Sequence, residues 1–242
     1  MESIERFSTL LECRNELDLR AMLFQLGDDY GYEQVLLALV PTRHTPLYEA
    51  TVHTNYSAEW MRTYMAAKLF DIDPTVHHSY RQSIPLIWKS RLFSSEAQKE
   101  MYEAACQYGL GNGLTLPFHG ANSELGLLCF VSSRQSEAQF HHDAMHNMPD
   151  LSLLRDFAFE AMLTLTQKTA GQHEPAPAVT SRELQCLKWS AAGKTSWEIG
   201  HILHCSEATI NFHFGNIRRK FNTATRRQAV VKAINWGLIG PS

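Results

Sequence analysis

The chain of 242 residues lacks the features that mark several large classes of protein. No apolar run reaches the roughly 18 residues that a membrane-spanning helix requires. The first ten residues, MESIERFSTL, place no basic segment ahead of an apolar one, so we expect no secretory signal there. These absences favour a protein of the cytoplasm that has no membrane partner.

Cysteine is scarce and poorly placed for cross-linking. The five cysteines are Cys13, Cys106, Cys129, Cys186 and Cys205, and no two of them form a C-x-x-C pair. An odd number at wide spacing is typical neither of a disulfide framework nor of a zinc-binding knuckle. We therefore expect free thiols and a reducing compartment.

Patterns for catalysis and metal binding are also missing. The chain has no ordered Ser-His-Asp set, no glycine-rich phosphate loop, no paired carboxylates and no acidic cluster of a phosphoacceptor receiver. His142 with His146, and His201 with His204, could each share a metal ion, but no cysteine or carboxylate completes either set. Cys129 would need a paired base to act as a nucleophile, so a buried packing thiol is the preferred interpretation. The sequence predicts no enzyme, no metal site and no cofactor.

Charge is present but unevenly distributed along the chain. The 22 Lys and Arg residues and the 25 Asp and Glu residues give a formal net charge of −3. From Thr180 onward, nine basic and three acidic residues give +6, so the preceding part carries −9. A small basic unit joined to a larger acidic one indicates that only the C-terminal part meets a polyanion.

The segment TAGQHEPAPAV separates these two parts. It is rich in Pro, Ala and Gly and has no apolar period, and Pro175 and Pro177 oppose a helix there. We predict an N-terminal domain over 1–168, a linker over 169–179 and a C-terminal domain over 180–242.

The N-terminal part mixes helical and extended patterns. Apolar residues at helical spacing predict helices, and short apolar runs between turn residues predict strands. The expected helices are Ile4–Leu26, Ser57–Leu69, Ser94–Tyr108 and Phe140–Lys168, and the expected strands are Tyr32–Val40, Tyr48–Tyr56 and a hairpin of LTLPFHG with ELGLLCFV. We predict an α/β/α sandwich around an antiparallel sheet, which places the whole chain in the α+β class.

The C-terminal part carries unusually clear helix signals. Its three capping boxes are Thr180 with Glu183, Thr195 with Glu198, and Thr225 with Gln228. Ser206 can cap a further helix, so we expect four helices and no strand. A short helix followed closely by a longer basic one is the layout of a helix-turn-helix domain.

The basic helix over Glu207–Phe221 has two different sides. One side is the apolar stripe of Ile210, Phe214, Ile217 and Phe221. The other side carries mainly Asn211, Gly215, Arg218 and Arg219. Amide and guanidinium groups can pair with base edges, and Lys or Arg also anchors phosphates. The residues predicted to meet DNA are Lys194, Thr195, Ser196, Thr209, Asn211, Gly215, Arg218, Arg219 and Lys220.

Charge alone leaves a second interpretation open, in which this surface is only a solvated basic face on a helical bundle. The charge split and the layout of capped helices favour DNA as the partner.

Both halves of the chain resemble one family. The C-terminal residues TSRE, W-x3-GKT-x2-EI and S-x2-T-I-x-F-H-x3-I-x2-K-F resemble the DNA-binding domain of LuxR-type transcriptional regulators. The segments NYSAEWMRTY, DIDPTVHH, PLIW and GLTLPFHG resemble the acyl-homoserine-lactone-binding domain of quorum-sensing receptors. TSWEI, CSEA and NFHFGNIRRKF bring the resemblance closest to the Las-type receptor of pseudomonads. The resemblance implies that the third of the four helices enters the major groove, and that Val230, Ala233 and Ile234 on the last helix form dimer contacts.

The resemblance also implies how a lactone is held. Trp60 would donate to the lactone carbonyl, Asp73 would accept from the amide N–H, and Tyr56 would donate to the amide carbonyl. The predicted ligand-binding residues are Leu36, Ala38, Val40, Tyr56, Trp60, Tyr64, Asp73, Thr75, Val76, Trp88, Leu110, Thr115, Leu127 and Cys129, with Val52, Gly113 and Leu125 beside them. Without the family, the aromatic residues would be core residues and Asp73 a turn or cap residue.

Some positions depart from the family's pattern. Cys129, a weak donor, stands where the family often has Ser or Thr. Met61 stands where the Las-type receptor has an arginine that is linked to 3-oxo recognition, while Arg62 points elsewhere. Leu127 and Ala38 are bulkier than their counterparts, so we expect a shorter tail pocket that favours chains of about six to ten carbons.

The sequence thus predicts a ligand-responsive transcription factor that binds an acyl-homoserine lactone and, as a homodimer, a palindromic site in double-stranded DNA. RNA polymerase is a further expected partner. Two alternatives remain. One is a receptor without its own synthase that answers foreign or non-lactone signals, and the other is an antagonist that forms inactive heterodimers with related receptors.

Overall fold

The computed structural model describes residues 2–121, 123–169 and 177–240. The chain divides into two compact units, Met1–Thr169 and Ala170–Ser242. Residues 170–176, most of the expected linker, lie outside the described part of the chain.

The first unit is built on one antiparallel sheet. Its strands are β1 (Gln34–Val40), β2 (Thr51–Thr54), β3 (Leu86–Ile87), β4 (Asn112–His119) and β5 (Leu125–Ser132). Their order across the sheet is β2-β1-β5-β4-β3, and every neighbouring pair runs antiparallel. The predicted hairpin is confirmed as β4 and β5, which pair along their full lengths.

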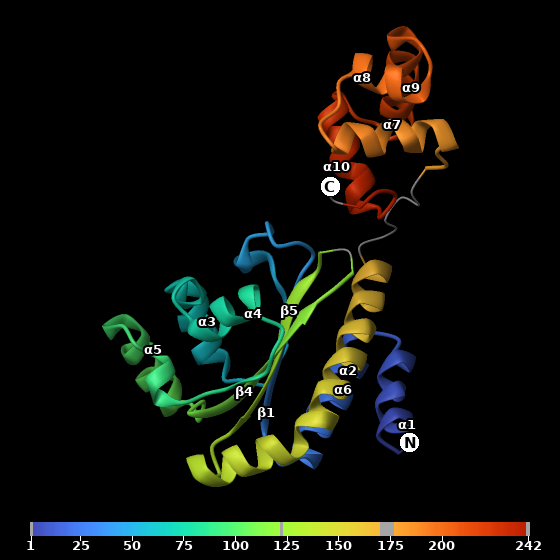
Figure 1. The fold of residues 1–242 in the computed structure, drawn as a ribbon. Coiled ribbons are helices and arrows are strands. Elements are labelled where there is room, and N and C mark those ends of the chain that lie inside the picture. The colour runs from blue at the N-terminus through green and yellow to red at the C-terminus, as the bar shows by residue number, and fades with distance from the viewer. Residues whose placement is uncertain (1, 122, 170–176, 241–242) are drawn as a thin grey trace. The chain divides into compact units, whose positions relative to one another are not determined.

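Helices cover both faces of this sheet (Figure 1). One face carries α1 (Glu2–Ser8), α2 (Glu16–Asp29) and α6 (Glu137–Thr169), and the other carries α3 (Ala58–Ala66), α4 (Pro74–Arg81) and α5 (Glu96–Gln107). The predicted α/β/α sandwich is confirmed.

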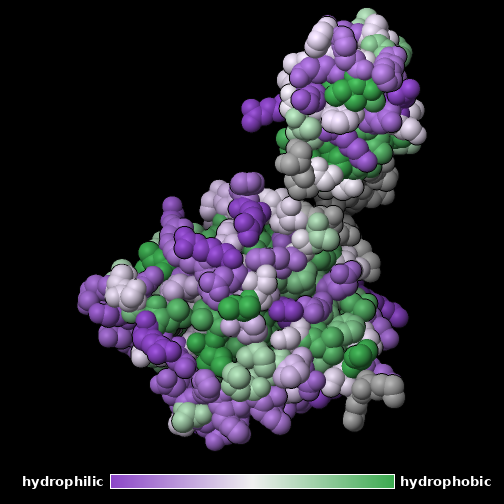
Figure 2. All heavy atoms as spheres, in the orientation of Figure 1, coloured by the Kyte–Doolittle hydropathy of each residue, from purple (hydrophilic) through white to green (hydrophobic). Residues whose placement is uncertain are grey.

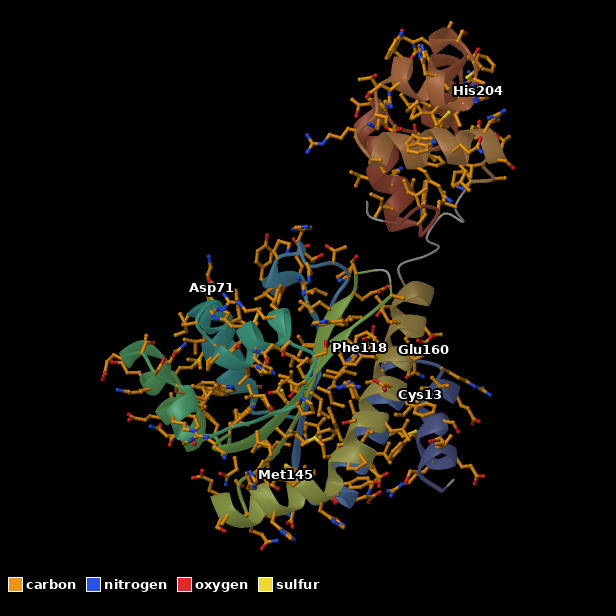
Figure 3. All side chains as sticks on the ribbon, in the orientation of Figure 1. Cys13, Asp71, Phe118, Met145, Glu160 and His204 are labelled. Carbon is orange, nitrogen blue, oxygen red and sulfur yellow. The ribbon has the colours of Figure 1, made fainter. Side chains whose placement is uncertain are left out.

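The face toward α2 and α6 is filled by the chain's own side chains. Val35, Leu37 and Phe130 are fully buried there. Phe118 of β4, which points toward α6 in Figure 3, stacks on Phe159 with ring centroids 4.0 Å apart. This face is a complete hydrophobic core.

Two predicted elements in the first half of the unit were wrong in extent. The single helix expected over Ile4–Leu26 is interrupted, because Asn15 adopts an extended conformation and accepts from the N–H of Asp18 to cap α2. The strand expected over Tyr48–Tyr56 shortens to β2, because a 3-10 turn occupies Leu47–Glu49.

Two elements were not predicted at all. Helix α4 begins at Pro74 with Asp73 as its N-cap, and Pro at the first helical position is compatible with a helix start. Strand β3 is only two residues long and pairs at the sheet edge with Thr115 and Leu114. Both elements are short and have no periodic pattern of apolar residues, so periodicity in the sequence could not reveal them.

The second unit consists of four helices in its described residues. They are α7 (Ser181–Ala191), α8 (Ser196–Leu203), α9 (Glu207–Lys220) and α10 (Arg226–Asn235). All three predicted capping boxes form, with both reciprocal hydrogen bonds present. The predicted stripe of Ile210, Phe214, Ile217 and Phe221 is buried in the unit's core.

The turn between α8 and α9 is tight. His204, labelled in Figure 3, ends α8 in the left-handed conformation with φ of 54°. The N–H of Cys205 then donates to Gly200, and a Cβ at Gly200 would lie 2.8 Å from the Cys205 carbonyl oxygen. Only glycine permits this approach, which confirms the predicted helix-turn-helix layout.

Hydrophobic residues also reach the surface of both units and lie among hydrophilic ones on the face in Figure 2. Leu17, Tyr48, Trp197 and Phe212 are each more than half exposed. Scattered apolar exposure of this kind is ordinary for a folded protein.

Candidate functional site

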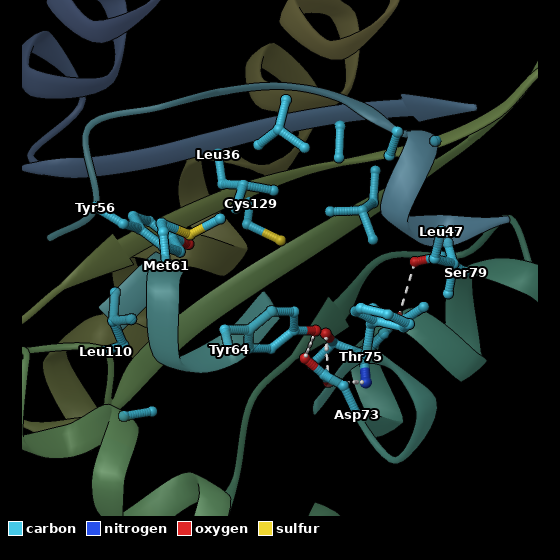
Figure 4. Close-up of a pocket in the computed structure, with 18 of the residues that line it drawn as sticks. Leu36, Leu47, Tyr56, Met61, Tyr64, Asp73, Thr75, Ser79, Leu110 and Cys129 are labelled. Carbon is cyan, nitrogen blue, oxygen red and sulfur yellow. Dashed lines mark hydrogen bonds between the residues drawn. The ribbon is translucent and has the colours of Figure 1, made fainter. Parts of the chain in front are cut away.

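A cavity of about 140 Å³ lies on the sheet face that α3, α4 and α5 cover (Figure 4). The predicted residues that line it are Leu36, Ala38, Val40, Val52, Tyr56, Trp60, Tyr64, Asp73, Thr75, Val76, Trp88, Leu110, Leu125, Leu127 and Cys129. Thr115 and Gly113 are not in its wall and act behind it. The cavity therefore brings together residues from segments far apart in the sequence.

Asp73 marks one polar point in the wall. Its Oδ1 accepts from the backbone N–H of Thr75 at 2.8 Å and from the Thr75 hydroxyl at 2.7 Å. Its Oδ2 accepts from the hydroxyl of Tyr64 at 2.8 Å, as the dashed lines in Figure 4 show. These contacts hold the carboxylate in one orientation at the start of α4. The interpretation of Asp73 as a cap residue and its place in the cavity wall are therefore compatible.

Tyr56 carries a hydroxyl that has no partner in the described part of the chain. Its oxygen is buried, and burial, followed by the nearby Cys129 and Asp73, raises the pKa of Tyr56 well above its ordinary value. The hydroxyl is therefore neutral and can donate. A buried polar group left unpaired costs about 1–3 kcal/mol, so this donor favours an occupant that presents an acceptor.

Trp88 forms part of the wall but has already used its indole N–H. That group donates to Thr115 Oγ1 at 2.8 Å. Thr115 in turn lies 3.3 Å from the sulfur of Cys129. A Cβ at Gly113 would lie 2.3 Å from the Trp88 ring, so glycine there leaves room for the indole. Thr115 and Gly113 thus support Trp88 from behind.

Cys129 lies between Thr115 and the cavity. Burial raises the pKa of its thiol to about 12. The sulfur therefore stays protonated at neutral pH, and only the thiolate is a good nucleophile. This agrees with the interpretation of Cys129 as a packing thiol.

Trp60 is 4 % exposed and lies among other aromatic rings. Its ring centroid is 5.9 Å from that of Tyr64 and 5.7 Å from that of Tyr108. Trp60 and Tyr64 stand four residues apart on α3, so they project from the same side of that helix.

The rest of the wall is mostly apolar. On β1, Leu36 and Ala38 line the cavity, whereas Val35 and Leu37 enter the opposite core, as alternation along a strand requires. Met61 also lines the cavity, and Arg62 is exposed.

Sequence reasoning missed part of the wall. The missed residues are Leu39, Leu47, Ala50, Met65, Phe70, Ser79, Tyr80, Phe93, Met101, Tyr102, Ala105 and Gly126. The helical spacing of Met101 and Ala105 on α5 is a signal that could have found those two.

The second unit presents the candidate DNA-binding surface. Asn211, Arg218 and Arg219 are exposed on α9, and no atom lies within 4 Å of a Cβ built at Gly215. At about 100° per residue, Asn211, Gly215 and Arg218 fall within one narrow face of the helix. An amide, an open backbone position and a guanidinium therefore share one face.

Lys220, a further residue predicted to meet DNA, lies on another side of α9. It is nine residues from Asn211, about half a turn around the helix. Its Nζ donates to the carboxylate of Glu183 at 2.7 Å and to the carbonyl of Ala178 at 3.0 Å. Burial alone would raise the pKa of Glu183, but hydrogen bonds from Lys220 and Thr180 lower it below its ordinary value. Lys220 is thus held against Glu183 of α7 and does not share the Asn211 face.

The remaining predicted DNA residues gather at the start of α8 and of α9. Lys194 forms an ion pair with Glu198 at 3.6 Å, and the Thr195 hydroxyl is used in the capping box. The Ser196 hydroxyl donates to Asn211 Oδ1 at 2.7 Å. The hydroxyls of Thr209 and Ser206 are 2.8 Å apart.

Neither unit offers a membrane span or a metal cluster in its described residues. No described helix is both long and apolar enough to cross a membrane. Nor do three or more His, Cys, Asp or Glu side chains gather there in a group that could hold a metal ion.

Comparison with known families matches both units separately. The model of the autoinducer binding domain matches residues 15–162. The model of bacterial regulatory proteins of the luxR family matches residues 177–233.

Individual relatives match along nearly the whole chain. The transcriptional activator protein VanR of Vibrio anguillarum is 32% identical over 226 residues, which cover 93% of this chain and 92% of VanR. The regulatory protein SdiA of Escherichia coli is 33% identical over 235 residues, which cover 97% of this chain and 93% of SdiA. The structure of SdiA in complex with octanoyl-rac-glycerol superposes with a TM-score of 0.72 at 26% identity and covers 98% of this chain and 94% of that one. VanR thus bears the name of a transcriptional activator, and SdiA that of a regulatory protein.

Proposed function

Because the chain belongs to the luxR family of bacterial regulatory proteins and carries that family's autoinducer-binding domain, we propose that it activates transcription in quorum sensing when an N-acyl-homoserine lactone occupies its first unit. Ligand binding and DNA binding are the functions of its two matched domains. Several relatives, VanR among them, bear the name transcriptional activator.

The unpartnered hydroxyl of Tyr56 is the observation that carries the choice of ligand class. It is a neutral, buried donor in the same cavity wall as the oriented carboxylate of Asp73. A secondary amide presents one carbonyl acceptor and one N–H donor, which suits this pair of groups. An acyl-homoserine lactone carries such an amide between its ring and its chain.

In this arrangement the amide carbonyl accepts from Tyr56, and the amide N–H donates to Asp73. Trp60 donates its indole N–H to the lactone carbonyl. Cys129 contributes little as a donor, because a thiol forms weak hydrogen bonds. Tyr56 therefore acts as the main donor to the amide carbonyl.

The acyl chain lies against the apolar wall. Leu36, Ala38 and Leu127 from the sheet line the cavity, and the bulk of Ala38 and Leu127 supports a chain of about six to ten carbons. Met61 offers no polar group to a 3-oxo oxygen, so unsubstituted chains are preferred. The likeness to the Las-type receptor stays a prediction.

Occupancy of this cavity stabilises the first unit by RT ln(1 + [L]/Kd). The ordered protein works in the cytoplasm as a homodimer, to which the partly exposed Val230 and Ile234 of α10 contribute. Ala233, the third residue that the resemblance implied, is fully buried in the core of its own unit and has no surface to offer a partner. Two copies of α9 then read the two halves of a palindromic site in the major groove, and the bound dimer engages RNA polymerase.

Thermal unfolding of the full chain with a panel of lactones tests the ligand. The panel would run from about four to fourteen carbons, with and without the 3-oxo group, because an occupant of the cavity raises Tm. We expect a rise in Tm confined to medium chains and abolished in Asp73→Ala and Trp60→Ala. A panel in which no lactone raises Tm refutes the ligand class. A panel in which the lactone with a twelve-carbon chain gives the largest rise in Tm refutes the proposed chain length.

A second candidate is a receptor for non-lactone acyl compounds. SdiA has been solved with octanoyl-rac-glycerol, a glycerol ester of an eight-carbon acid. Including that compound in the same panel separates the two candidates, since its ester group has no N–H and only its glycerol hydroxyls could donate to Asp73. For a receptor of acyl-homoserine lactones, the lactone, which contains the amide, should raise Tm far more than the glycerol ester does.

An antagonist that forms inactive heterodimers is the third possibility. The exposed Asn211, Arg218 and Arg219 favour direct DNA binding instead. A gel-shift assay of the purified chain alone on selected duplex DNA distinguishes them, because an antagonist would give no shifted band.

A further inference from the structure

Arg226, the first residue of α10, donates three hydrogen bonds from its guanidinium group to other segments of the second unit. Its Nε donates to the hydroxyl of Ser190 at 2.7 Å. One terminal nitrogen donates to the hydroxyl of Ser196 at 3.0 Å, and the other donates to the carbonyl of Lys194 at 2.8 Å. The side chain is half-buried. Arg226 therefore links the end of α7 and the start of α8 from a third helix.

The aromatic ring of Phe214 supports the same guanidinium from below. The guanidinium carbon lies 4.1 Å from the ring centroid, within the range of a cation–π contact. Burial lowers the pKa of Arg226, yet arginine keeps its charge. Since Phe214 belongs to the buried stripe of α9, the arginine is held against the back of that helix.

Ser196 connects Arg226 to the exposed side of α9 by hydrogen bonds. Its oxygen accepts from Arg226, and its single proton is donated to Asn211 Oδ1 at 2.7 Å. A hydroxyl has only one proton to donate. Ser196 therefore holds the amide of Asn211 instead of donating to a phosphate.

This contact sets which end of the amide faces outward. With Oδ1 turned to Ser196, the Nδ2 group of Asn211 is the part left to meet an acceptor on a base edge. Asn211 is exposed and lies on the same face of α9 as Gly215 and Arg218. The amide is thus oriented before any DNA arrives, which saves the entropy of ordering it on binding.

We propose that Arg226 and Ser196 are positioning residues for sequence readout, because the chain from Arg226 through Ser196 fixes the amide of Asn211. The proposal rests on the DNA-binding function proposed above and adds to it a determinant of specificity on α10. Arg226 itself contacts neither a base nor a phosphate in this arrangement.

Selection from random DNA tests this. The full chain, with and without N-octanoyl-homoserine lactone, would be incubated with random-sequence duplexes, and the bound duplexes would be sequenced. Asn211→Ala identifies the base pair that Asn211 reads, since a good base contact discriminates by about 5- to 150-fold. Ser196→Ala and Arg226→Lys are the test variants. Arg227→Lys is the matched control, because Arg227 is the exposed neighbour on the same helix.

We expect Ser196→Ala and Arg226→Lys to weaken the preference at the base pair that Asn211→Ala identifies, by at least about 2-fold, as for coupled neighbours. Arg227→Lys should leave that preference unchanged. In the double variant of Ser196→Ala with Asn211→Ala, the second change should have no further effect at that base pair. Loss of the guanidinium fork explains why lysine, which keeps the charge, does not restore the preference.

Uniformly weaker binding with an unchanged base preference would overturn the proposal, since it is the result of a merely structural or phosphate-binding role. So would an Asn211→Ala variant with the wild-type preference at every position. If Arg226→Lys unfolds at the assay temperature, Ser196→Ala decides, because it removes a single hydroxyl. A wild-type chain that enriches no sequence at all would instead refute the DNA-binding function itself.

Discussion

Replacing Tyr56 with phenylalanine separates a ligand-binding hydroxyl from a structural one. In the unliganded chain the hydroxyl oxygen is buried and has no partner in the described residues. Removing an unpaired buried group relieves a cost of about 1–3 kcal/mol. The unliganded Tyr56→Phe chain should therefore be more stable than the wild type.

The effect on ligand affinity has the opposite sign. Without the Tyr56 hydroxyl, the amide carbonyl of the lactone loses its main donor and stays buried in an apolar wall. The cost is again about 1–3 kcal/mol, which raises Kd by about 5- to 150-fold. One substitution thus stabilises the free protein and weakens its complex.

Two measurements check this prediction. Thermal unfolding without ligand should give a higher Tm, by about 2–4 °C for each kcal/mol gained in a chain of this size. Isothermal titration with N-octanoyl-homoserine lactone should give the higher Kd. Tyr48→Phe is the control, because Tyr48 is 63% exposed and its change should alter neither quantity.

A lower Tm together with an unchanged Kd would refute the reasoning. That pair of results would mean that the hydroxyl has a structural partner and that the ligand does not reach it.

Three further predictions follow from other contacts. Gly113→Ala puts a Cβ 2.3 Å from the Trp88 ring, so it should destabilise the first unit by about 1–3 kcal/mol, measured by urea unfolding against Gly240→Ala, where no atom lies within 4 Å. Glu183 has a lowered pKa in the folded state, so its pairing with Lys220 should stabilise the chain at neutral pH and be lost as pH falls below about 4.3. Unfolding curves of the wild type and Glu183→Gln should therefore converge in acid, and a constant gap would contradict the pairing. The thiol of Cys129, with its pKa of about 12, should resist iodoacetamide at pH 8 while exposed Cys106 reacts, as mass spectrometry of digests would show. Rapid alkylation of Cys129 in the folded chain would contradict its burial.

Much of the fold could be predicted because its signals are local. In each capping box, two residues three apart exchange hydrogen bonds between side chain and backbone N–H, and the stripe on α9 needs only helical spacing. Strand β1 was found from its apolar run, and alternation also explains which of its residues face the cavity. Such features depend on neighbours in sequence and require no knowledge of distant contacts.

The features that were missed depend on contacts between distant segments. Lys220 of α9 pairs with Glu183 of α7, which stands 37 positions earlier in the chain. The hydroxyl of Ser196 at the start of α8 donates to Asn211 on the next helix. Thr115 lies outside the cavity wall and accepts a hydrogen bond from the indole N–H of Trp88. A sequence reveals that such groups can form hydrogen bonds but not which partner they meet.

The two faces of the central sheet have different surroundings, so side chains on opposite faces of one strand have different roles. Along β1, Val35 and Leu37 belong to a permanent core, while Leu36 and Ala38 border an open volume. Substitutions at the second pair can reshape the cavity without disturbing the opposite side of the sheet. Along 35–38 the two sets of positions can therefore diverge independently, whereas Leu39 borders both the core and the cavity. A lineage can thus change the signal it detects while it keeps the same scaffold.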